Sequence, residues 1–337
     1  MAPCAAIFGP AGTEISDWER GFFSETRPLG FILFARNVES PDQLRRLTAD
    51  LRAAAGHDAL VLIDQEGGRV QRLRPPHWRD WRPPLEDAVR AREPARAMAL
   101  RYRIIGQDLR ALGIDVNAVP CADLARPETH PFLRNRCYGA AVADVTRIAR
   151  AVADGCLAGG VLPVLKHLPG HGRAQADSHL DLPRVAAPAA ALTATDFAPF
   201  RALADLALGM TAHVVFEGLG QQAPATQSPE MIRLIRQDLG FAGLLMSDDI
   251  GMAALSGPVE MRAAAALAAG CDVVLHCNGE RAEIAQVAKV CGPLDGAAEA
   301  RARAALDSRP VPAPVDISAL VAEFEALVGP APGRGGR

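Results

Sequence analysis

Residues 166–183 hold the densest group of potentially catalytic side chains in the sequence. Within 18 positions the segment contains four proline or glycine residues and seven side chains that can carry a charge: Lys166, His167, His171, Arg173, Asp177, His179 and Asp181. A single one of these histidines would be typical of a solvated surface loop. The whole group, however, follows directly after the apolar run 161–165, and its prolines and glycines exclude a core helix. Histidine near a carboxylate suits proton transfer at neutral pH, so the pattern predicts a catalytic loop at the end of a strand.

A second position with chemical potential is Asp248, which comes just after the apolar run 243–246. A charge at the end of a buried strand is costly unless it faces a polar opening. Neighbouring strand residues point to opposite sides, so Asp248 and Asp249 cannot both attack the same atom. We therefore expect Asp249 to be structural and to cap a helix that begins near Gly251.

Residues 166–183 resemble the signature of glycoside hydrolase family 3, in the branch of bacterial β-N-acetylglucosaminidases that recycle cell-wall sugars. Further matches lie at 64–72, 136–138 and 243–252, in the family's order along the chain. The resemblance implies a cofactor-free, retaining exo-β-N-acetylglucosaminidase, and as its substrates muropeptide-derived disaccharides such as GlcNAc-1,6-anhydroMurNAc. The sequence departs from the family pattern at Arg173-Ala174 and Ile250-Gly251. These departures are expected to change the geometry of the two loops that contain them.

The same resemblance assigns catalytic roles to three residues. A retaining glycosidase needs a carboxylate nucleophile and a separate acid/base group. The resemblance implies that Asp248 is the nucleophile and His179 the acid/base, with Asp177 as the partner of His179. A neighbouring carboxylate stabilises the imidazolium and selects the tautomer, so such a histidine can both donate and accept a proton.

Sugar binding is expected from the positions that match the family's binding residues, namely Asp64, Arg72, Arg136, Lys166 and His167. A carboxylate accepts hydrogen bonds from hydroxyls, and arginine or lysine donates them, which holds a sugar ring in one orientation. His171 is expected to be part of the loop structure, hydrogen-bonded to the backbone of its own turn.

Four alternatives remain open. The same fold could act as a β-N-acetylglucosaminide phosphorylase or as a broader β-glycosidase, and the sequence does not separate hydrolysis from phosphorolysis. A non-catalytic sugar-binding barrel is disfavoured because both the nucleophile and the His–Asp pair are present. A metal-dependent barrel hydrolase would draw its ligands from His167, His171, His179, His213 and Asp248. The run 5–8 offers no His-x-His ligands, and Pro169 and Gly170 prevent helical pairing of His167 with His171, so we expect no metal site.

The elements that must position these residues follow a repeating pattern. Eight short apolar runs are the predicted strands, near 5–8, 30–34, 59–63, 114–119, 161–165, 209–214, 243–246 and 271–275. Amphipathic helical patterns lie between most of them, at 41–55, 94–112, 141–155, 228–239 and 260–268. This alternation predicts an α/β fold, a single (β/α)8 TIM-type barrel. An open doubly wound sheet would be expected to carry a phosphate-binding glycine motif after an early strand, and the sequence has none there.

Polar residues follow seven of the eight runs, which is where the βα loops of a barrel begin. They are Arg36 and Asn37, Asp64, Asn117 and Asp123, Lys166 and His167, His213, Asp248, and His276 and Asn278. We therefore expect one polar pocket for a hydrophilic substrate. The catalytic barrel is predicted over 1–307, a helix packed on it within 308–328, and a disordered tail over 329–337.

Composition limits the remaining possibilities. The 337 residues are 49% hydrophobic and 22% charged with a net charge of −3, without the basic excess that nucleic acid or anionic membranes require. The N-terminus lacks a signal-peptide pattern, and no apolar run reaches 18 residues. Seven scattered cysteines show no CxxC spacing, which favours free thiols. We expect a cytoplasmic monomer whose partner is a small carbohydrate.

Overall fold

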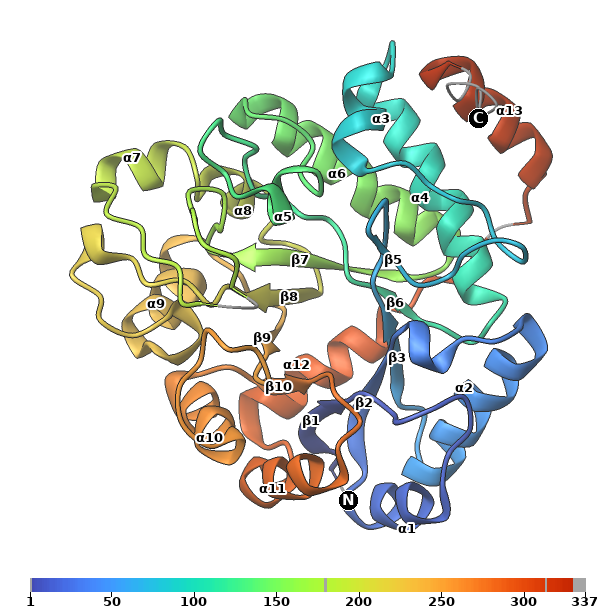
Figure 1. Ribbon diagram of the computed structural model, residues 1–337, viewed down its shortest axis with the longest axis vertical. Coiled ribbons are helices and arrows are strands. Elements are labelled where there is room, and N and C mark those ends of the chain that lie inside the picture. The colour runs from blue at the N-terminus through green and yellow to red at the C-terminus, as the bar shows by residue number, and fades with distance from the viewer. Residues whose placement is uncertain (1, 179–180, 313, 330–337) are drawn as a thin grey trace, which may run out of the picture.

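The computed structural model describes residues 2–178, 181–312 and 314–329, and its centre is a closed barrel of parallel strands (Figure 1). Around the barrel the strands follow the order β1, β10, β9, β8, β7, β6, β3, β2. They are β1 (Cys4–Phe8), β2 (Pro28–Leu33), β3 (Leu60–Ile63), β6 (Val116–Asn117), β7 (Leu162–Leu168), β8 (Leu208–Thr211), β9 (Leu244–Asp249) and β10 (Val273–His276). Each predicted apolar run overlaps one of these strands, which confirms the (β/α)8 barrel.

The barrel strands read as continuous apolar runs because both of their faces are covered. All four residues of β3, Leu-Val-Leu-Ile, are fully buried. The strand predicted at 114–119 is shorter than expected, although the amide of Asp115 still donates to Val61 and that of Ala118 to Ile63, each at 2.9 Å. A separate antiparallel hairpin, β4 (Gln65–Gly67) with β5 (Val70–Gln71), follows β3 directly.

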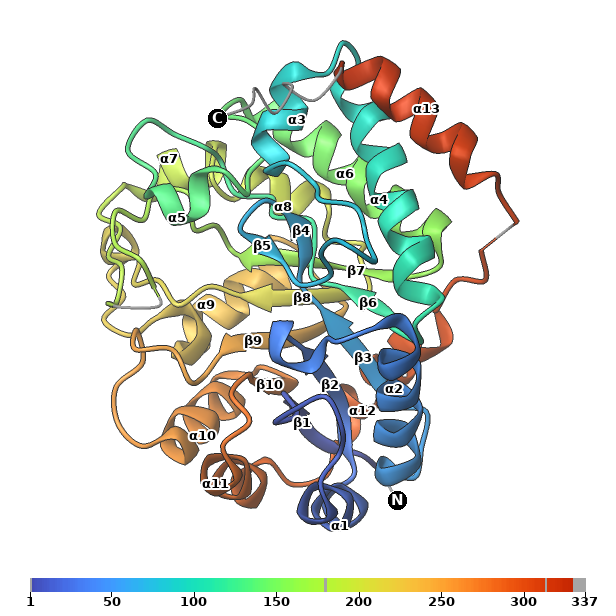
Figure 2. The same ribbon diagram turned by 45° about the vertical axis from the view of Figure 1, so that its right-hand side comes forward.

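Helices surround the barrel (Figures 1 and 2). They are α1 (Asp17–Thr26), α2 (Pro41–Ala55), α3 (Pro84–Arg90), α4 (Pro94–Arg110), α5 (Pro131–Arg134), α6 (Val142–Gly159), α7 (Ala189–Ala194), α8 (Ala198–Ala202), α9 (Pro229–Arg233), α10 (Val259–Ala269), α11 (Arg281–Cys291), α12 (Gly296–Asp307) and α13 (Ile317–Val328). Single 3₁₀ turns occur at Ala35–Asn37, Glu217–Leu219 and Ala225–Gln227. Within the described part of the chain, no helix has the length and apolar character needed to cross a bilayer.

The ends of α2 are set by its sequence. The hydroxyl of Ser40 accepts a hydrogen bond from the amide of Gln43, and Pro41 occupies the first helical position, where its missing N–H costs nothing. Gly56 ends the helix with φ at +65°, a conformation that suits glycine. Between these signals, Leu44, Leu47 and Leu51 repeat at helical spacing and are buried.

Two predicted helices differ from the structure. The helix expected at 228–239 is α9 followed by a π-helical turn, Leu234–Asp238. The helix expected near Gly251 does not form there, because 250–255 are turns and α10 begins only at Val259, directly after Gly257 and Pro258. The prediction that Asp249 caps a helix is therefore wrong.

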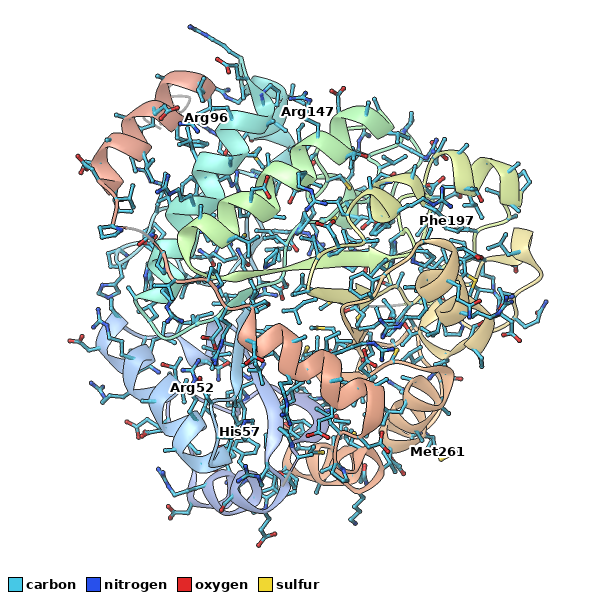
Figure 3. All side chains as sticks on the ribbon, turned by 180° about the vertical axis from the view of Figure 1, so that it is seen from behind. Arg52, His57, Arg96, Arg147, Phe197 and Met261 are labelled. Atoms are coloured by element: carbon cyan, nitrogen blue, oxygen red, sulfur yellow. The ribbon has the colours of Figure 1, made fainter. Side chains whose placement is uncertain are left out.

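The last described helix, α13, packs against α4. Arg96 of α4 donates to Glu323 of α13 at 2.7 Å, and Figure 3 shows Arg96 beside that helix. The rings of Trp81 and Phe324 meet edge to face, with their centroids 5.4 Å apart. Of the tail predicted over 329–337, residues 330–337 lie outside the described part of the chain.

Candidate active site

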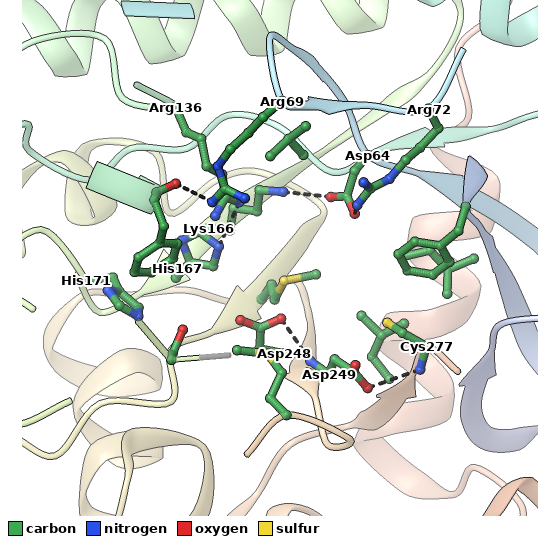
Figure 4. A pocket seen from close by; sticks show the side chains of 18 residues that line it. Asp64, Arg69, Arg72, Arg136, Lys166, His167, His171, Asp248, Asp249 and Cys277 are labelled. Carbon is green, nitrogen blue, oxygen red and sulfur yellow. Dashed lines mark hydrogen bonds and ion pairs between the residues drawn. The ribbon is translucent and has the colours of Figure 1, made fainter. Parts of the chain in front are cut away.

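A cavity of about 300 Å³ lies at the carboxyl ends of the barrel strands (Figure 4). In barrel enzymes this is the end that carries the catalytic groups. Its charged and polar lining side chains are Asp64, Arg69, Arg72, Arg136, Lys166, His167, His171, Ser178, Asp248 and Asp249. The structure thus brings together Asp248 and all five of the predicted sugar-binding residues.

A buried group of charges forms one wall of this cavity. The Lys166 ammonium contacts Asp64 at 2.9 Å and Glu66 at 2.7 Å. Arg136 donates two hydrogen bonds to Glu66, at 2.8 and 2.9 Å, and Arg72 donates to Asp64 at 3.0 Å. Three cations therefore face two carboxylates, and the wall carries a net positive charge.

The pKa values of the two carboxyls reflect this group. Burial raises the pKa of Asp64, but the charges of Lys166 and Arg72 outweigh burial and hold it well below its usual range. In the same way, Arg136 and Lys166 lower the pKa of Glu66 to about 2 against the effect of burial. Burial lowers the pKa of Lys166, while Asp64 and Glu66 raise it above its ordinary value. All of these groups are charged at neutral pH.

Lys166→Met is expected to destabilise the fold by about 3–5 kcal/mol, because it leaves the buried Glu66 carboxylate and the partly buried Asp64 carboxylate without one of their cations. Chemical denaturation at neutral pH measures this change. The control is Lys289→Met, which removes the only other lysine of the chain, an exposed one, and should change stability by less than about 0.5 kcal/mol. Equal unfolding midpoints for the two variants would contradict the role of the charge group.

A second hydrogen-bonded group holds His167. Asp123 accepts from His167 Nδ1 at 2.8 Å and from the backbone amide of His171, and the thiol of Cys121 lies 3.4 Å from Asp123. Arg136 Nη2 lies 3.3 Å from His167 Nε2. Arginine can only donate, so we infer that His167 carries its proton on Nδ1 and accepts at Nε2.

The donor atoms of Cys121, Asp123 and His167 also lie within 4.8 Å of one another, the spacing of a possible metal site among the described residues. Asp123 and His167 are already hydrogen-bonded to each other, and an N–H of Arg136 points to the second ring nitrogen of His167. A metal ion on Nδ1 would need the other tautomer, which would place two N–H donors against each other. This arrangement supports positioning of His167 rather than metal binding.

The two adjacent aspartates at the end of β9 differ in their contacts. Asp249 Oδ1 accepts from the amides of Gly251 and Cys277, each at 3.0 Å, so this carboxylate ties the ends of two strands together. The Asp249 amide donates to Asp248 Oδ1 at 2.8 Å. Figure 4 shows Asp249 turned toward Cys277 and Asp248 facing the middle of the cavity. Both line the cavity, but the Asp249 carboxylate is occupied by backbone amides.

His213, which the sequence places at the end of a predicted strand, supports the backbone beside this pair. Its Nε2 lies 3.0 Å from the carbonyl oxygen of Asp249, and its Nδ1 lies 2.8 Å from the hydroxyl of Thr226. Burial lowers the pKa of His213, so the ring is neutral and Nε2–H donates to the carbonyl. Both nitrogens are engaged, which leaves His213 no part in metal binding.

Near its C-terminal end, the segment 166–183 lines the cavity with Ser178, which is buried. Asp177 is half-buried just before it. His179 lies outside the described residues, so its role and its pairing with Asp177 stay predictions.

His171 is placed differently from the expectation. Its ring lines the cavity, and neither ring nitrogen has a hydrogen-bond partner among the described residues. The interpretation that the ring bonds to its own turn is wrong, because it is the backbone amide of His171 that anchors the loop, by donating to Asp123.

Sequence reasoning missed Glu66 and the pairing of Asp123 with His167. Glu66 could have been found, because Asp64 and Glu66 are two residues apart. In an extended segment, side chains at that spacing point to the same side. Asp123 and His167 lie 44 positions apart, and no local pattern connects them.

The comparisons with known proteins agree with this geometry. The family model described as the glycosyl hydrolase family 3 N terminal domain matches residues 18–306. The β-hexosaminidase of Alkalilimnicola ehrlichii is 41% identical over 280 residues, covering 81% of this chain and 80% of the relative. A β-hexosaminidase of Stenotrophomonas maltophilia is 38% identical over 286 residues, covering 81% of this chain and 83% of that one.

Among solved structures, native NagZ from Neisseria gonorrhoeae superimposes with a TM-score of 0.84 at 28% identity, covering 97% of this chain and 96% of that one. The same protein has been solved in complex with N-trifluoroacetyl-D-glucosamine, with a TM-score of 0.84 and 97% of both chains covered. The family model spans the barrel strands from β2 to β10 and all residues of the charge group. The chain therefore belongs to glycosyl hydrolase family 3, as a β-hexosaminidase of that family.

Proposed function

We propose that this enzyme is a retaining exo-β-N-acetylglucosaminidase that releases GlcNAc from muropeptide-derived disaccharides such as GlcNAc-1,6-anhydroMurNAc, with or without peptide. The observation that carries the proposal is the Asp248 carboxylate at the end of β9, which faces the cavity across from Asp64 and Lys166 (Figure 4). The gonococcal NagZ complex with N-trifluoroacetyl-D-glucosamine supports binding of a 2-acylamino sugar in this fold. The muropeptide aglycone is supported by the family resemblance of residues 166–183.

The charge group is suited to binding the sugar hydroxyls. A carboxylate offers about four acceptor sites, so Asp64 can accept from hydroxyls while it holds Lys166 and Arg72. The ammonium of Lys166 has three donors, of which two point to Asp64 and Glu66. Because the cations are fixed by these ion pairs, they meet the substrate without reorganising.

For a retaining enzyme we propose two displacement steps. Asp248 attacks the anomeric carbon, the glycosidic C–O bond breaks, and the leaving oxygen takes a proton from the acid/base. In the second step water gives a proton back to that group and attacks the same carbon, which releases GlcNAc and regenerates the Asp248 carboxylate. We assign the acid/base role to His179, with Asp177 as its partner, on the resemblance alone.

A panel of p-nitrophenyl β-glycosides tests the proposal, and the N-acetylglucosaminide should have the highest kcat/KM. NMR of the first product should show the β-anomer of GlcNAc. The disaccharide GlcNAc-1,6-anhydroMurNAc, assayed in phosphate buffer, should give free GlcNAc. Release of the sugar 1-phosphate would mean phosphorolysis, and preference for a glucoside would mean a broader β-glycosidase.

We also propose that the enzyme acts in the cytoplasm. Each of the seven cysteines, all of them within the described residues, carries a free thiol. Thiol titration of denatured protein purified without added oxidant should therefore find seven reactive groups. Two or more stable disulfides would contradict a reducing compartment.

A further inference from the structure

The His171 ring is a buried polar group with no assigned use. It is 2% exposed and lines the cavity, and neither of its nitrogens has a hydrogen-bond partner among the described residues. Nearly all buried polar side chains in proteins are hydrogen-bonded, so an unpaired one at the wall of a binding cavity indicates a bound partner.

Packing fixes the direction of this ring. The His171 ring meets the Phe132 ring at 80° with centroids 5.6 Å apart, and the His167 ring at 66° with centroids 5.7 Å apart. Its backbone amide is anchored on Asp123. The packing thus fixes the direction of the two ring nitrogens, although neither makes a hydrogen bond within the described residues. A preorganised recognition group has this property.

The protonation state of the ring restricts its partner. Burial, together with the nearby His167, lowers the pKa of His171 to about 4, so the ring is neutral at the pH of the cytoplasm. A neutral imidazole presents one donor and one acceptor. Such a ring can donate to the carbonyl oxygen of a secondary amide or accept from its N–H.

We propose that His171 recognises the 2-acetamido group of the substrate and so helps the enzyme to choose N-acetylglucosaminides over glucosides. The inference rests on the proposed function and adds a residue that determines its specificity. Figure 4 shows His171 on the side of the cavity opposite Arg72 and Asp64, where His167 is its neighbour.

The test compares kcat/KM on p-nitrophenyl N-acetyl-β-glucosaminide with kcat/KM on the β-glucoside. In His171→Phe this ratio should fall about tenfold or more, because the amide loses its partner while the glucoside loses nothing. His171→Asn keeps a donor group and an acceptor and should recover part of the ratio. The matched control is His77→Phe at an exposed histidine, which should leave the ratio unchanged.

An equal loss on both glycosides, or an unchanged ratio, would show that His171 only supports the loop and would overturn the inference. If wild-type enzyme hydrolyses neither glycoside, the proposed function itself fails, and that result is visible without any variant. A measurement on wild-type protein covers the case in which His171→Phe does not fold. The ¹⁵N ring signals of His171, identified by their loss in His171→Asn, should shift on adding N-acetylglucosamine and not on adding glucose, and unshifted signals would overturn the inference.

Discussion

Asp248→Asn is expected to lower kcat for p-nitrophenyl N-acetyl-β-glucosaminide by about 10⁴-fold or more, the scale on which removal of an enzyme nucleophile acts. The amide has nearly the shape of the carboxylate, so the substitution removes the negative charge and the nucleophile with little change in packing. The side chain sits at the end of β9 and faces the centre of the cavity. Steady-state kinetics with a matched circular dichroism spectrum measures the loss.

The neighbouring residue supplies the control for this variant. Asp249→Asn keeps an oxygen that can accept from the amides of Gly251 and Cys277, so its loss of kcat should be far smaller. If Asp249→Asn lost as much activity as Asp248→Asn, the two roles would have to be exchanged.

Asp177→Ala should reduce turnover by about 10² to 10⁴-fold, the usual range for loss of acid/base assistance. We expect Asp177 to set the tautomer and orientation of His179 rather than to touch the substrate. The effect should be largest on a substrate with a poor leaving group, which needs full protonation of the departing oxygen. A comparison of alkyl and p-nitrophenyl N-acetyl-β-glucosaminides measures it.

Asp181→Ala is the matched control, because Asp181 is an exposed residue in the same loop whose carboxylate accepts from the amide of Leu182. It should keep wild-type turnover. Wild-type turnover of Asp177→Ala on the alkyl glycoside would rule out the proposed pair.

The barrel could be predicted from the sequence because its strands are buried on both faces. A run such as Leu-Val-Leu-Ile at β3 has no solvated side, and the helices between the runs carry clear signals, as at Ser40 and Gly56 of α2. Boundaries were harder to predict. β6 is reduced to Val116–Asn117, and the start of α10 depends on Gly257 and Pro258 rather than on the aspartates before them.

Site residues were predictable where the position of a residue along its own strand decides where its side chain points. Asp64, Lys166 and Asp248 lie in or just after strands that point at the cavity, and all three line it. Contacts between distant segments were not predictable, because they depend on how the loops pack. The bond between Asp123 and His167 and the unpaired ring of His171 are of this kind.

The central claim is that Asp248 forms the covalent intermediate, and active-site trapping tests it most directly. A fluorinated N-acetylglucosaminyl fluoride that slows the second step should leave one sugar on the peptide containing Asp248, as found by mass spectrometry of the digested enzyme. The competing mechanism uses the acetamido oxygen of the substrate as nucleophile, with adjacent carboxylates in support, and leaves no sugar on the protein. A label on Asp248 is the predicted result, whereas a label on Asp249, or no label with turnover intact, would contradict it.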